Sequence, residues 1–464
     1  MCFCQSKEKG KMSIRTKLAA AVVTAVLMGG VGSRAARLTA GAGEPGATGT
    51  SDKAERKGPL AALPSAPGPH LEKVRALGDN QWLNLGPPAA DPKWGRARGR
   101  AWGGKAFALA PDIRGAYFTG EGIHAYVKPD GYGMNDYWVY DINAHRWICI
   151  YPGTNTKTLT QQVRNGDLKV NEHGLVTDKD GRSMPGHLIH AWGFLTYDTD
   201  RKKFAVMADC GYNKYYFPGT SYNSRDAKDV AEGLGLLQEQ MKDKAAQTLS
   251  PWFYDTARGE FERYALSAAS RAIQGFNSHP QFMYIPSRKQ PLLFSEKKAA
   301  YFDPDRKSWT TVEVKGAGPS GGDIGACYDS KRDRIWSGAI GPMAMKKGDR
   351  NAILAFDIKT ETWSRPDARG ECPQAWSTNR CSVHYDSAGD VVLFLNYPDR
   401  TLHAYDPETG TWASPVPLPD GTKRPSDCGH AFYDPELNVH FVFFAGDSVD
   451  NGVMWVYRHK KAGK

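Results

Sequence analysis

An eight-residue pattern that recurs five times constrains the fold of this chain more than any other feature. YDINAHRW, YDTARGEF, FDPDRKSW, FDIKTETW and YDPETGTW begin at residues 140, 254, 302, 356 and 405. Short β-type runs flank each copy, so the pattern predicts a β-hairpin. Asp at the first turn position can accept bonds from backbone N–H groups, and the aromatic residue six positions later begins the next strand. Residues with this predicted structural role are Asp141, Trp147, Asp255, Phe261, Asp303, Trp309, Asp357, Trp363, Asp406 and Trp412.

A second pattern precedes four of the copies and also predicts a hairpin. It reads TYDTDRKKFAV, CYDSKRDRIW, HYDSAGDVVLFL and FYDPELNVHFVFF, beginning at residues 196, 327, 384 and 432, with weaker versions at 110–118 and 285–294. Two hairpins make a unit of four strands. Asp255, Asp303, Asp357 and Asp406 lie about 50 residues apart, and four strands in about 50 residues is the period of a β-propeller blade.

The ends of the repeat array predict how the ring closes. The last unit lacks its fourth strand, and an isolated QWLNLG containing Trp82 stands before the first unit. An N-terminal strand that completes the last blade would remove a free sheet edge. The predicted blades are 98–152, 181–267, 268–317, 318–368, 372–420, and 424–459 completed by 81–86.

A seventh blade is the alternative, because 114 residues separate Asp141 from Asp255. Long loops explain this gap better. Residues 226–247, DAKDVAEGLGLLQEQMKDKAAQ, have the composition of a helix and predict a helical insertion in the second blade.

The N-terminus has the pattern of a secretory signal peptide, predicted at 1–36. A basic segment beginning at Met12, an alternative start residue, precedes an apolar stretch at 18–31 that is short for a membrane span. The Ala-, Gly- and Pro-rich residues 37–79 predict a flexible linker before a propeller at 80–464. We therefore expect an exported protein, periplasmic or extracellular, without a transmembrane anchor.

The net charge of the chain bears on the class of partner that it could bind. Residues 1–36 carry a net charge of +5, which leaves +5 of the chain's +10 on the remaining residues. This mild charge, without a recognisable binding motif, argues against a nucleic-acid partner.

Six cysteines follow residue 36, and Cys372 with Cys381 is the simplest local disulfide. Buried thiols are the alternative.

The hairpin pattern, DYWVYD and the 50-residue period resemble kelch repeats of the galactose-oxidase-like propeller class, as in exported bacterial kelch proteins. The resemblance covers about 80–459. It departs from the family at the double glycine, where GEG (120–122), CG (210–211) and AG (445–446) stand. It implies a six-bladed all-β propeller whose innermost strands begin at the upper mouth of a central channel.

The resemblance also indicates which residues face that mouth. The innermost strands would place Lys105, His190, His279, Asp323, Asn379, Arg380 and Asp427 there. Long loops of blades 1 and 2 add His124, Tyr126, Lys128, Tyr132, Tyr212, Tyr215, Tyr216 and Tyr222. Aromatic rings beside hydrogen-bonding side chains suit a carbohydrate or a protein ligand. The alternative is that these groups satisfy strand ends, channel water and loop packing.

Two enzyme hypotheses follow from the resemblance. A galactose-oxidase-type copper site would need a contiguous Tyr-His pair, and the chain has only the reverse, His384–Tyr385. A sugar mutarotase would need an acid and a base, for which His190, His279, Asp323 or Asp427 could serve. No motif supports either activity. The sequence therefore favours a binding scaffold without a cofactor, with a carbohydrate-active enzyme as the alternative.

Overall fold

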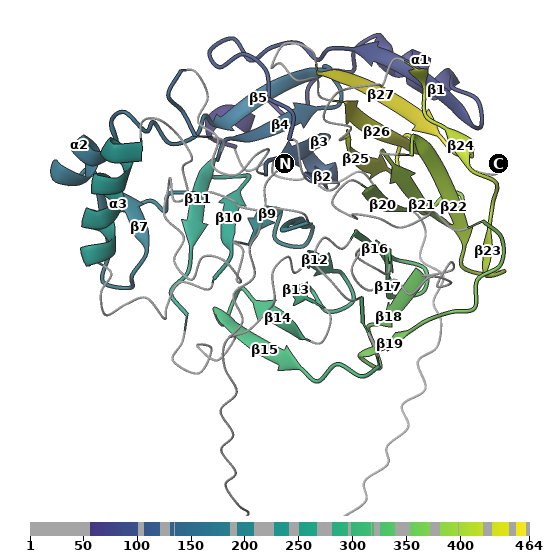
Figure 1. Ribbon diagram of the computed structural model, residues 1–464. Helices are drawn as coiled ribbons and strands as arrows, with labels where there is room; N and C mark the ends of the chain where they lie inside the picture. Colours follow the sequence, from purple (N-terminus) through teal and green to yellow (C-terminus); the bar gives the residue numbers. More distant parts are fainter. Residues whose placement is uncertain are drawn as a thin grey trace, which may run out of the picture. The chain divides into compact units, whose positions relative to one another are not determined.

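The two hairpin patterns fold into six antiparallel sheets, which are the blades of a β-propeller (Figure 1). The computed structural model describes residues 56–100, 106–120, 130–133, 135–185, 193–207, 227–240, 250–266, 281–295, 298–316, 318–319, 325–338, 353–371, 381–397, 399–420, 429–444 and 452–460. Each innermost strand contacts the innermost strands of the two neighbouring blades, so the contacts form a closed ring of six. The predicted six-bladed fold is confirmed.

The strands of each blade follow one another in the chain. Blade 1 holds β2 (Phe107–Ala110), β3 (Gly115–Phe118), β4 (Tyr137–Asp141) and β5 (Arg146–Tyr151). Blade 2 holds β8 (Leu195–Asp198), β9 (Lys203–Val206), β10 (Trp252–Asp255) and β11 (Glu260–Arg263). Blade 3 holds β12 (Gln281–Ile285), β13 (Gln290–Phe294), β14 (Ala299–Asp303) and β15 (Ser308–Val312).

The remaining blades follow the same order, and the last takes a strand from the start of the chain. Blade 4 holds β16 (Ala326–Asp329), β17 (Arg334–Gly338), β18 (Ile353–Asp357) and β19 (Thr362–Ser364). Blade 5 holds β20 (Cys381–Asp386), β21 (Val391–Asn396), β22 (Thr401–Asp406), β23 (Thr411–Trp412) and the short β24 (Val416–Pro417). Blade 6 holds β25 (Gly429–Asp434), β26 (Val439–Phe444), β27 (Val453–Arg458) and β1 (Gln81–Gly86).

The Asp of each repeated pattern holds its turn through backbone N–H groups. Asp303 Oδ1 accepts bonds from the N–H groups of Asp305 and Arg306, both at 2.9 Å. Asp406 Oδ1 does the same for Glu408 and Thr409. The residue four positions after the Asp has positive φ in the outer turns, as at His145, Gly259, Lys307, Glu361 and Gly410. This uniform turn is the physical reason for the repeated spacing.

The aromatic residue six positions after each Asp packs between neighbouring blades. Trp147, Trp309, Trp363 and Trp412 are buried, and Phe261 is half-buried. Trp147 contacts Phe443 of blade 6 at 5.2 Å between ring centroids. Because each of these rings fills the space between two sheets, the apolar core is a series of clusters between adjacent blades.

β1 closes the ring as the sequence predicts. It pairs antiparallel with β27, with Trp82 opposite Tyr457 and Leu83 opposite Val456. The Trp82 and Tyr457 rings lie 4.6 Å apart between centroids. The chain start thus supplies the outer strand of blade 6, next to its C-terminal strand (Figure 1).

Residues 56–79 differ from the expected flexible linker, because they form helices that pack on the propeller. These are η1 (Gly58–Leu60) and α1 (His70–Ala76), and Leu60, Leu71 and Val74 are at most 1% exposed. Lys57 N–H donates to Ala257 O of blade 2 at 2.9 Å. The apolar residues of this segment are widely spaced among Pro and Gly, so the sequence shows no helical or strand periodicity there. Each of them nevertheless packs into the surface of the blades.

The helical insertion in blade 2 is present as α3 (Ala227–Gln240), between β9 and β10. It packs against α2 (Leu159–Arg164), and a Cβ on Gly233 would lie 3.0 Å from the Thr160 backbone. The strands β6 (Leu168–Val170) and β7 (Val176–Asp178) complete a small apolar cluster with these helices. The 3-10 helix η2 (Pro111–Ile113) follows β2. None of the helices in the described part of the chain is long and apolar enough to cross a membrane.

Introducing a glycine at the positive-φ turn position and removing one from it should change the free energy of unfolding in opposite directions. We expect Lys202→Gly to raise the free energy of unfolding by about 1 kcal/mol, because a side chain in the left-handed region is strained. Lys202 is exposed and its φ is 54°. Gly410→Ala should lower that free energy by about 1 kcal/mol, since its φ is 67° and a Cβ would lie 3.0 Å from Asp367 O. Urea unfolding of both variants measures this, and changes of the same sign would contradict the account.

Candidate ligand site in the central channel

Of the residues that the sequence places at the channel mouth and its loops, Tyr132 is described, and the ten main ligand-binding candidates all lie outside the described residues. They are His124, Tyr126, Lys128, His190, Tyr215, Tyr216, His279, Asp323, Arg380 and Asp427. Cys372 also lies outside them, while Cys381 is buried in β20. The predicted upper site and the predicted disulfide therefore stay predictions, and the described geometry concerns another part of the channel.

The described residues enclose a cavity of about 350 Å³ between the six innermost strands. Every blade contributes to its wall, through β2, β8, β12, β16, β20 and β25. The lining comes from the innermost strands and from the turn residues that follow three of them, Pro111, Thr199 and Pro286. The cavity thus occupies the part of the channel toward the inner hairpin turns.

Five tyrosines from five different blades line this cavity at the same position of the repeat. Tyr197, Tyr284, Tyr328, Tyr385 and Tyr433 belong to blades 2 to 6, and Leu109 takes the position in blade 1. We call these five the tyrosine ring. In four blades the next residue is an Asp that is fully buried, because successive side chains of a strand point to opposite faces.

Each phenol of the tyrosine ring donates a hydrogen bond to a side chain at an inner turn. Tyr197 donates to Asp112 Oδ1 of the neighbouring blade at 2.5 Å, and Tyr284 donates to Asp200 of the neighbouring blade. The other three donate within their own blades, Tyr328 to Asp333 at 2.7 Å, Tyr385 to Asp390 at 2.8 Å and Tyr433 to Asn438 at 3.1 Å. These bonds fix the ring planes before a ligand arrives.

Burial raises the pKa of every phenol in the tyrosine ring. It raises the pKa of Tyr433 to about 12, and it raises the pKa of the other four phenols well above the ordinary value. Acceptor carboxylates raise those four further. Phenols of ordinary pKa are already neutral at physiological pH, and these shifts keep the five neutral at more alkaline pH as well.

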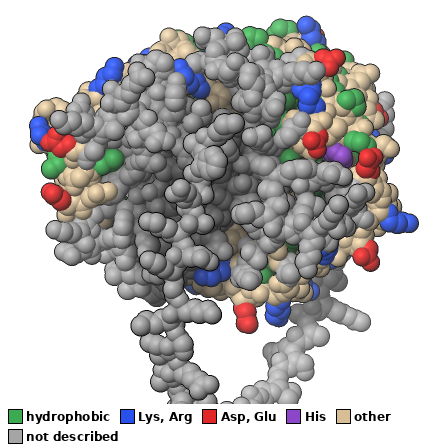
Figure 2. Space-filling model, viewed as in Figure 1, with side chains coloured by type: hydrophobic (Ala, Val, Ile, Leu, Met, Phe, Trp, Pro, Cys, Tyr) green, Lys and Arg blue, Asp and Glu red, His purple; other side chains and the backbone are tan. Residues whose placement is uncertain are grey.

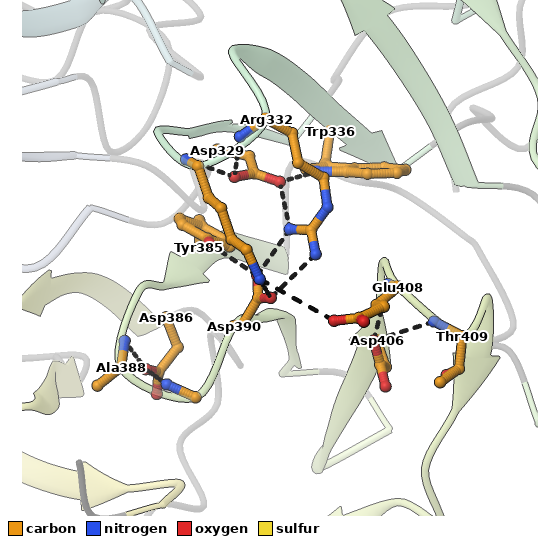
Figure 3. Close-up of polar contacts among 12 residues, drawn as sticks. Asp329, Arg332, Trp336, Tyr385, Asp386, Ala388, Asp390, Asp406, Glu408 and Thr409 are labelled. Carbon is orange, nitrogen blue, oxygen red and sulfur yellow. Dashed lines mark hydrogen bonds and ion pairs between the residues drawn. The ribbon is translucent and has the colours of Figure 1, made fainter. Parts of the chain in front are cut away.

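Ion pairs between blades 4 and 5 support the ring from outside the cavity (Figure 3). Asp390 accepts bonds from Arg332 Nη1 at 2.6 Å and Nη2 at 2.9 Å as well as from Tyr385. Hydrogen bonding to Arg332 holds the pKa of Asp390 well below its usual range. Arg332 also donates to Asp329 Oδ2 at 3.0 Å, an atom that Trp336 Nε1 bonds as well. The network joins the inner turns of two blades into one rigid unit.

The boundaries of blade 6 hold comparable pairs. Arg114 of blade 1 donates two bonds to the Asp434 carboxylate, at 2.8 and 3.1 Å. His440 lies 3.2 Å from Asp386 Oδ2 of blade 5, and both residues are buried. Burial alone would raise the pKa of Asp386, but the bond from His440 holds it below the usual value. These groups are committed to joining blades and are not free for chemistry.

Backbone groups add polarity to the cavity wall. Within the described part of the chain each innermost strand pairs with one strand only, so its other edge faces the channel. Part of the β12 edge is used across the blade boundary, where Phe282 N–H donates to Gly193 O at 2.8 Å. An edge strand carries further N–H and C=O groups along its length. The wall therefore combines aromatic rings with hydrogen-bonding backbone.

The described side chains give no evidence for a metal-binding site. They contain no cluster of three or more His, Cys, Asp or Glu that could hold an ion. Cys327 and His384 line the cavity on neighbouring blades, next to Tyr328 and Tyr385 in their strands. The wall of the cavity combines aromatic rings with hydrogen-bonding groups, which suits the binding of a ligand.

The tyrosine ring is the feature that the sequence interpretation missed. Its signal is the dipeptide Tyr-Asp, which recurs at 197, 328, 385 and 433 in the inner hairpins. Turn formation explains the Asp of this pattern but not the Tyr. Alternation along a strand places the Tyr on the face opposite the turn-forming Asp, and the recurrence of Tyr there in several blades is the signal of a second role.

No family model and no curated protein sequence matches the chain. The resemblance to kelch repeats accordingly stays a prediction from motif spacing.

Proposed function

We propose that the protein is an exported kelch-type propeller, periplasmic or extracellular, that binds a small carbohydrate in its central channel. The observation that supports this is the cavity of about 350 Å³ that is lined by the tyrosine ring and by residues of all six innermost strands. A volume near the lower end for small-molecule pockets fits one or two sugar rings and not a polymer. Sugars present apolar faces to aromatic rings and hydroxyls to backbone edges.

A protein ligand is less well suited to this cavity, since a stable protein interface buries roughly 1,200–2,000 Å² of surface. Such a ligand would bind the loops of the upper mouth, where His124, Tyr126, Tyr215 and Tyr216 are predicted. The enzyme alternative depends on acids and bases predicted at that mouth. No feature of the described site favours it, so binding is the function that we propose.

Filling the cavity entrance tests the proposal. A panel of monosaccharides and disaccharides is first screened for ligands that raise the melting temperature of the full chain. A ligand at 100 times its Kd should stabilise the fold by about 2.7 kcal/mol. Thr199→Trp, at an exposed lining position, should abolish this stabilisation by occupying the site.

The matched control is Ser330→Trp. Ser330 is the corresponding exposed turn residue of blade 4, and it does not line the cavity. The Ser330→Trp variant should bind the sugar with the affinity of the unmodified protein. If Thr199→Trp folds normally and keeps full affinity, the ligand does not enter this channel and the proposal fails.

A further inference from the structure

A second surface with binding chemistry lies on the outer strand of blade 1, away from the channel. Residues 92–100, PKWGRARGR, hold a Trp and four basic residues, of which Arg100 is buried in an ion pair with Asp136. This segment runs beside β5, because Ala89 forms a bridge with Arg146 and Cys149 N–H donates to Asp91 Oδ2 at 3.1 Å. None of its residues lines the channel cavity.

The turn that presents the Trp is held rigidly. Asp91 Oδ1 accepts bonds from the N–H groups of Lys93 and Trp94, both at 2.9 Å, and Asp91 also bridges to Gly95. The Asp91 carboxylate is therefore committed to backbone groups on both oxygens. Trp94 is half-buried against the core between blades 6 and 1, which leaves part of its indole at the surface.

A segment distant in sequence brings Tyr132 to the same place. The Trp94 and Tyr132 rings lie 5.6 Å apart between centroids and meet edge to face at 72°. Tyr132 is half-buried, and its backbone is fixed by a bridge to Asn155. Gly133 N–H donates to Thr154 O at 2.8 Å and Thr156 N–H to Gly131 O at 2.9 Å. The aromatic pair is thus preorganised by two independent pieces of chain.

Exposed lysines flank the aromatic pair. Lys93 Nζ lies 4.9 Å from the Trp94 ring centroid. The Lys157 stem lies over Gly131, where a Cβ would come within 2.9 Å of Lys157 Cε. Within the described ranges neither ammonium group has an acidic side chain as an ion-pair partner. Lys93, Trp94, Tyr132 and Lys157 form what we call the basic aromatic patch.

Net charge at the patch is positive. Its own residues carry +2, from Lys93 and Lys157, and the adjoining turns hold Asp91 and Asp130. Both carboxylates accept backbone N–H groups, Asp130 from Tyr132 at 3.0 Å. In the view of Figure 2, both basic and acidic side chains lie around the periphery of the described surface.

We infer that the basic aromatic patch binds an acidic polysaccharide, through stacking of sugar rings on Trp94 and Tyr132 and pairing of carboxylates with Lys93 and Lys157. Neutral sugars would leave the ammonium groups unpaired and gain only the stacking. A nucleic acid would need a longer basic stripe that follows its phosphates. The inference is independent of the channel ligand, because the two sites share no residue.

Binding of a hexamer of galacturonic acid to the full chain, with the neutral galactose hexamer as the comparison, tests the inference. We expect the acidic hexamer to bind more tightly, and its affinity to fall as salt rises from low to moderate concentration. Trp94→Ala should weaken binding about tenfold, the scale of one lost aromatic stack. Lys93→Gln with Lys157→Gln, both at exposed positions, should weaken it by a factor of about three for each charge removed.

Two control variants separate the sites. Lys73→Gln removes an exposed charge on α1 and should leave binding unchanged, and Thr199→Trp should also leave it unchanged. Equal binding of the neutral hexamer, or full affinity of the double lysine variant, would overturn the inference. A 12-base-pair DNA duplex that binds more tightly than the acidic hexamer would overturn it in favour of a nucleic-acid partner.

Discussion

Replacing Asp434 with alanine should lower the free energy of unfolding by about 3–5 kcal/mol, the scale for breaking a buried ion pair from one side. The Asp434 carboxylate is fully buried and accepts two bonds from Arg114, whose side chain is 11% exposed. The substitution removes the buried partner of the guanidinium and leaves it with the exposed Glu436 carboxylate, 3.1 Å away. It also removes the acceptor for the N–H groups of Glu436 and Leu437.

The matched control is a surface pair of the same kind. Arg306 lies 3.8 Å from Asp303, and its side chain is 84% exposed, so Arg306→Ala should change the free energy by less than about 0.5 kcal/mol. The double variant Arg114→Met with Asp434→Leu should recover much of the loss, because no buried charge is left unpaired. Urea unfolding measures all three. A loss below about 1 kcal/mol for Asp434→Ala would contradict the assigned role of the pair.

Removing residues 53–86 should prevent the rest of the chain from folding cooperatively. The truncation takes away β1, which exposes the whole edge of β27, and it uncovers the sites that Leu60, Leu71 and Val74 fill. It also removes the acceptor Val74 O for Arg458 of β27, a bond of 2.9 Å. The segment joins blades 2, 1 and 6, so its loss acts where the ring closes.

Two truncations from the N-terminus separate the contribution of β1 from that of the preceding helices. A chain of residues 80–464 keeps β1 and should fold with reduced stability, whereas 87–464 should not. Leu71→Ala in the full chain should cost about 2–5 kcal/mol, as for a buried leucine, while Lys73→Ala on the exposed side of α1 should cost little. Circular dichroism and thermal unfolding report these outcomes. A cooperative transition of 87–464 at the temperature of the full chain would show that β1 is dispensable.

The number and order of the blades could be predicted because the repeat is local. The Asp, the positive-φ position and the Trp of one hairpin determine that hairpin, whatever the rest of the chain does. Even ring closure followed from counting strands, since QWLNLG was the one unpaired strand available for blade 6. The helix of blade 2 was predictable from composition alone.

Residues 56–79 and the tyrosine ring could not be predicted in the same way. Leu60 packs against residues of blades 1 and 2 and Leu71 against residues of blades 1 and 6, and no local periodicity reports these contacts. The ring arises because five equivalent tyrosines converge across five blades. Their hydrogen bonds to Asp112 and Asp200 cross blade boundaries, which the spacing of one repeat does not encode.

The most direct test of the binding function is a crystal structure of the protein soaked with the sugar that the stability screen identifies. We predict electron density for a sugar ring between the six innermost strands, in contact with the tyrosine ring around Tyr197 and Tyr385. Density for the sugar only on the outer surface, with ordered water alone filling the cavity, would contradict the assignment of the channel as the ligand site.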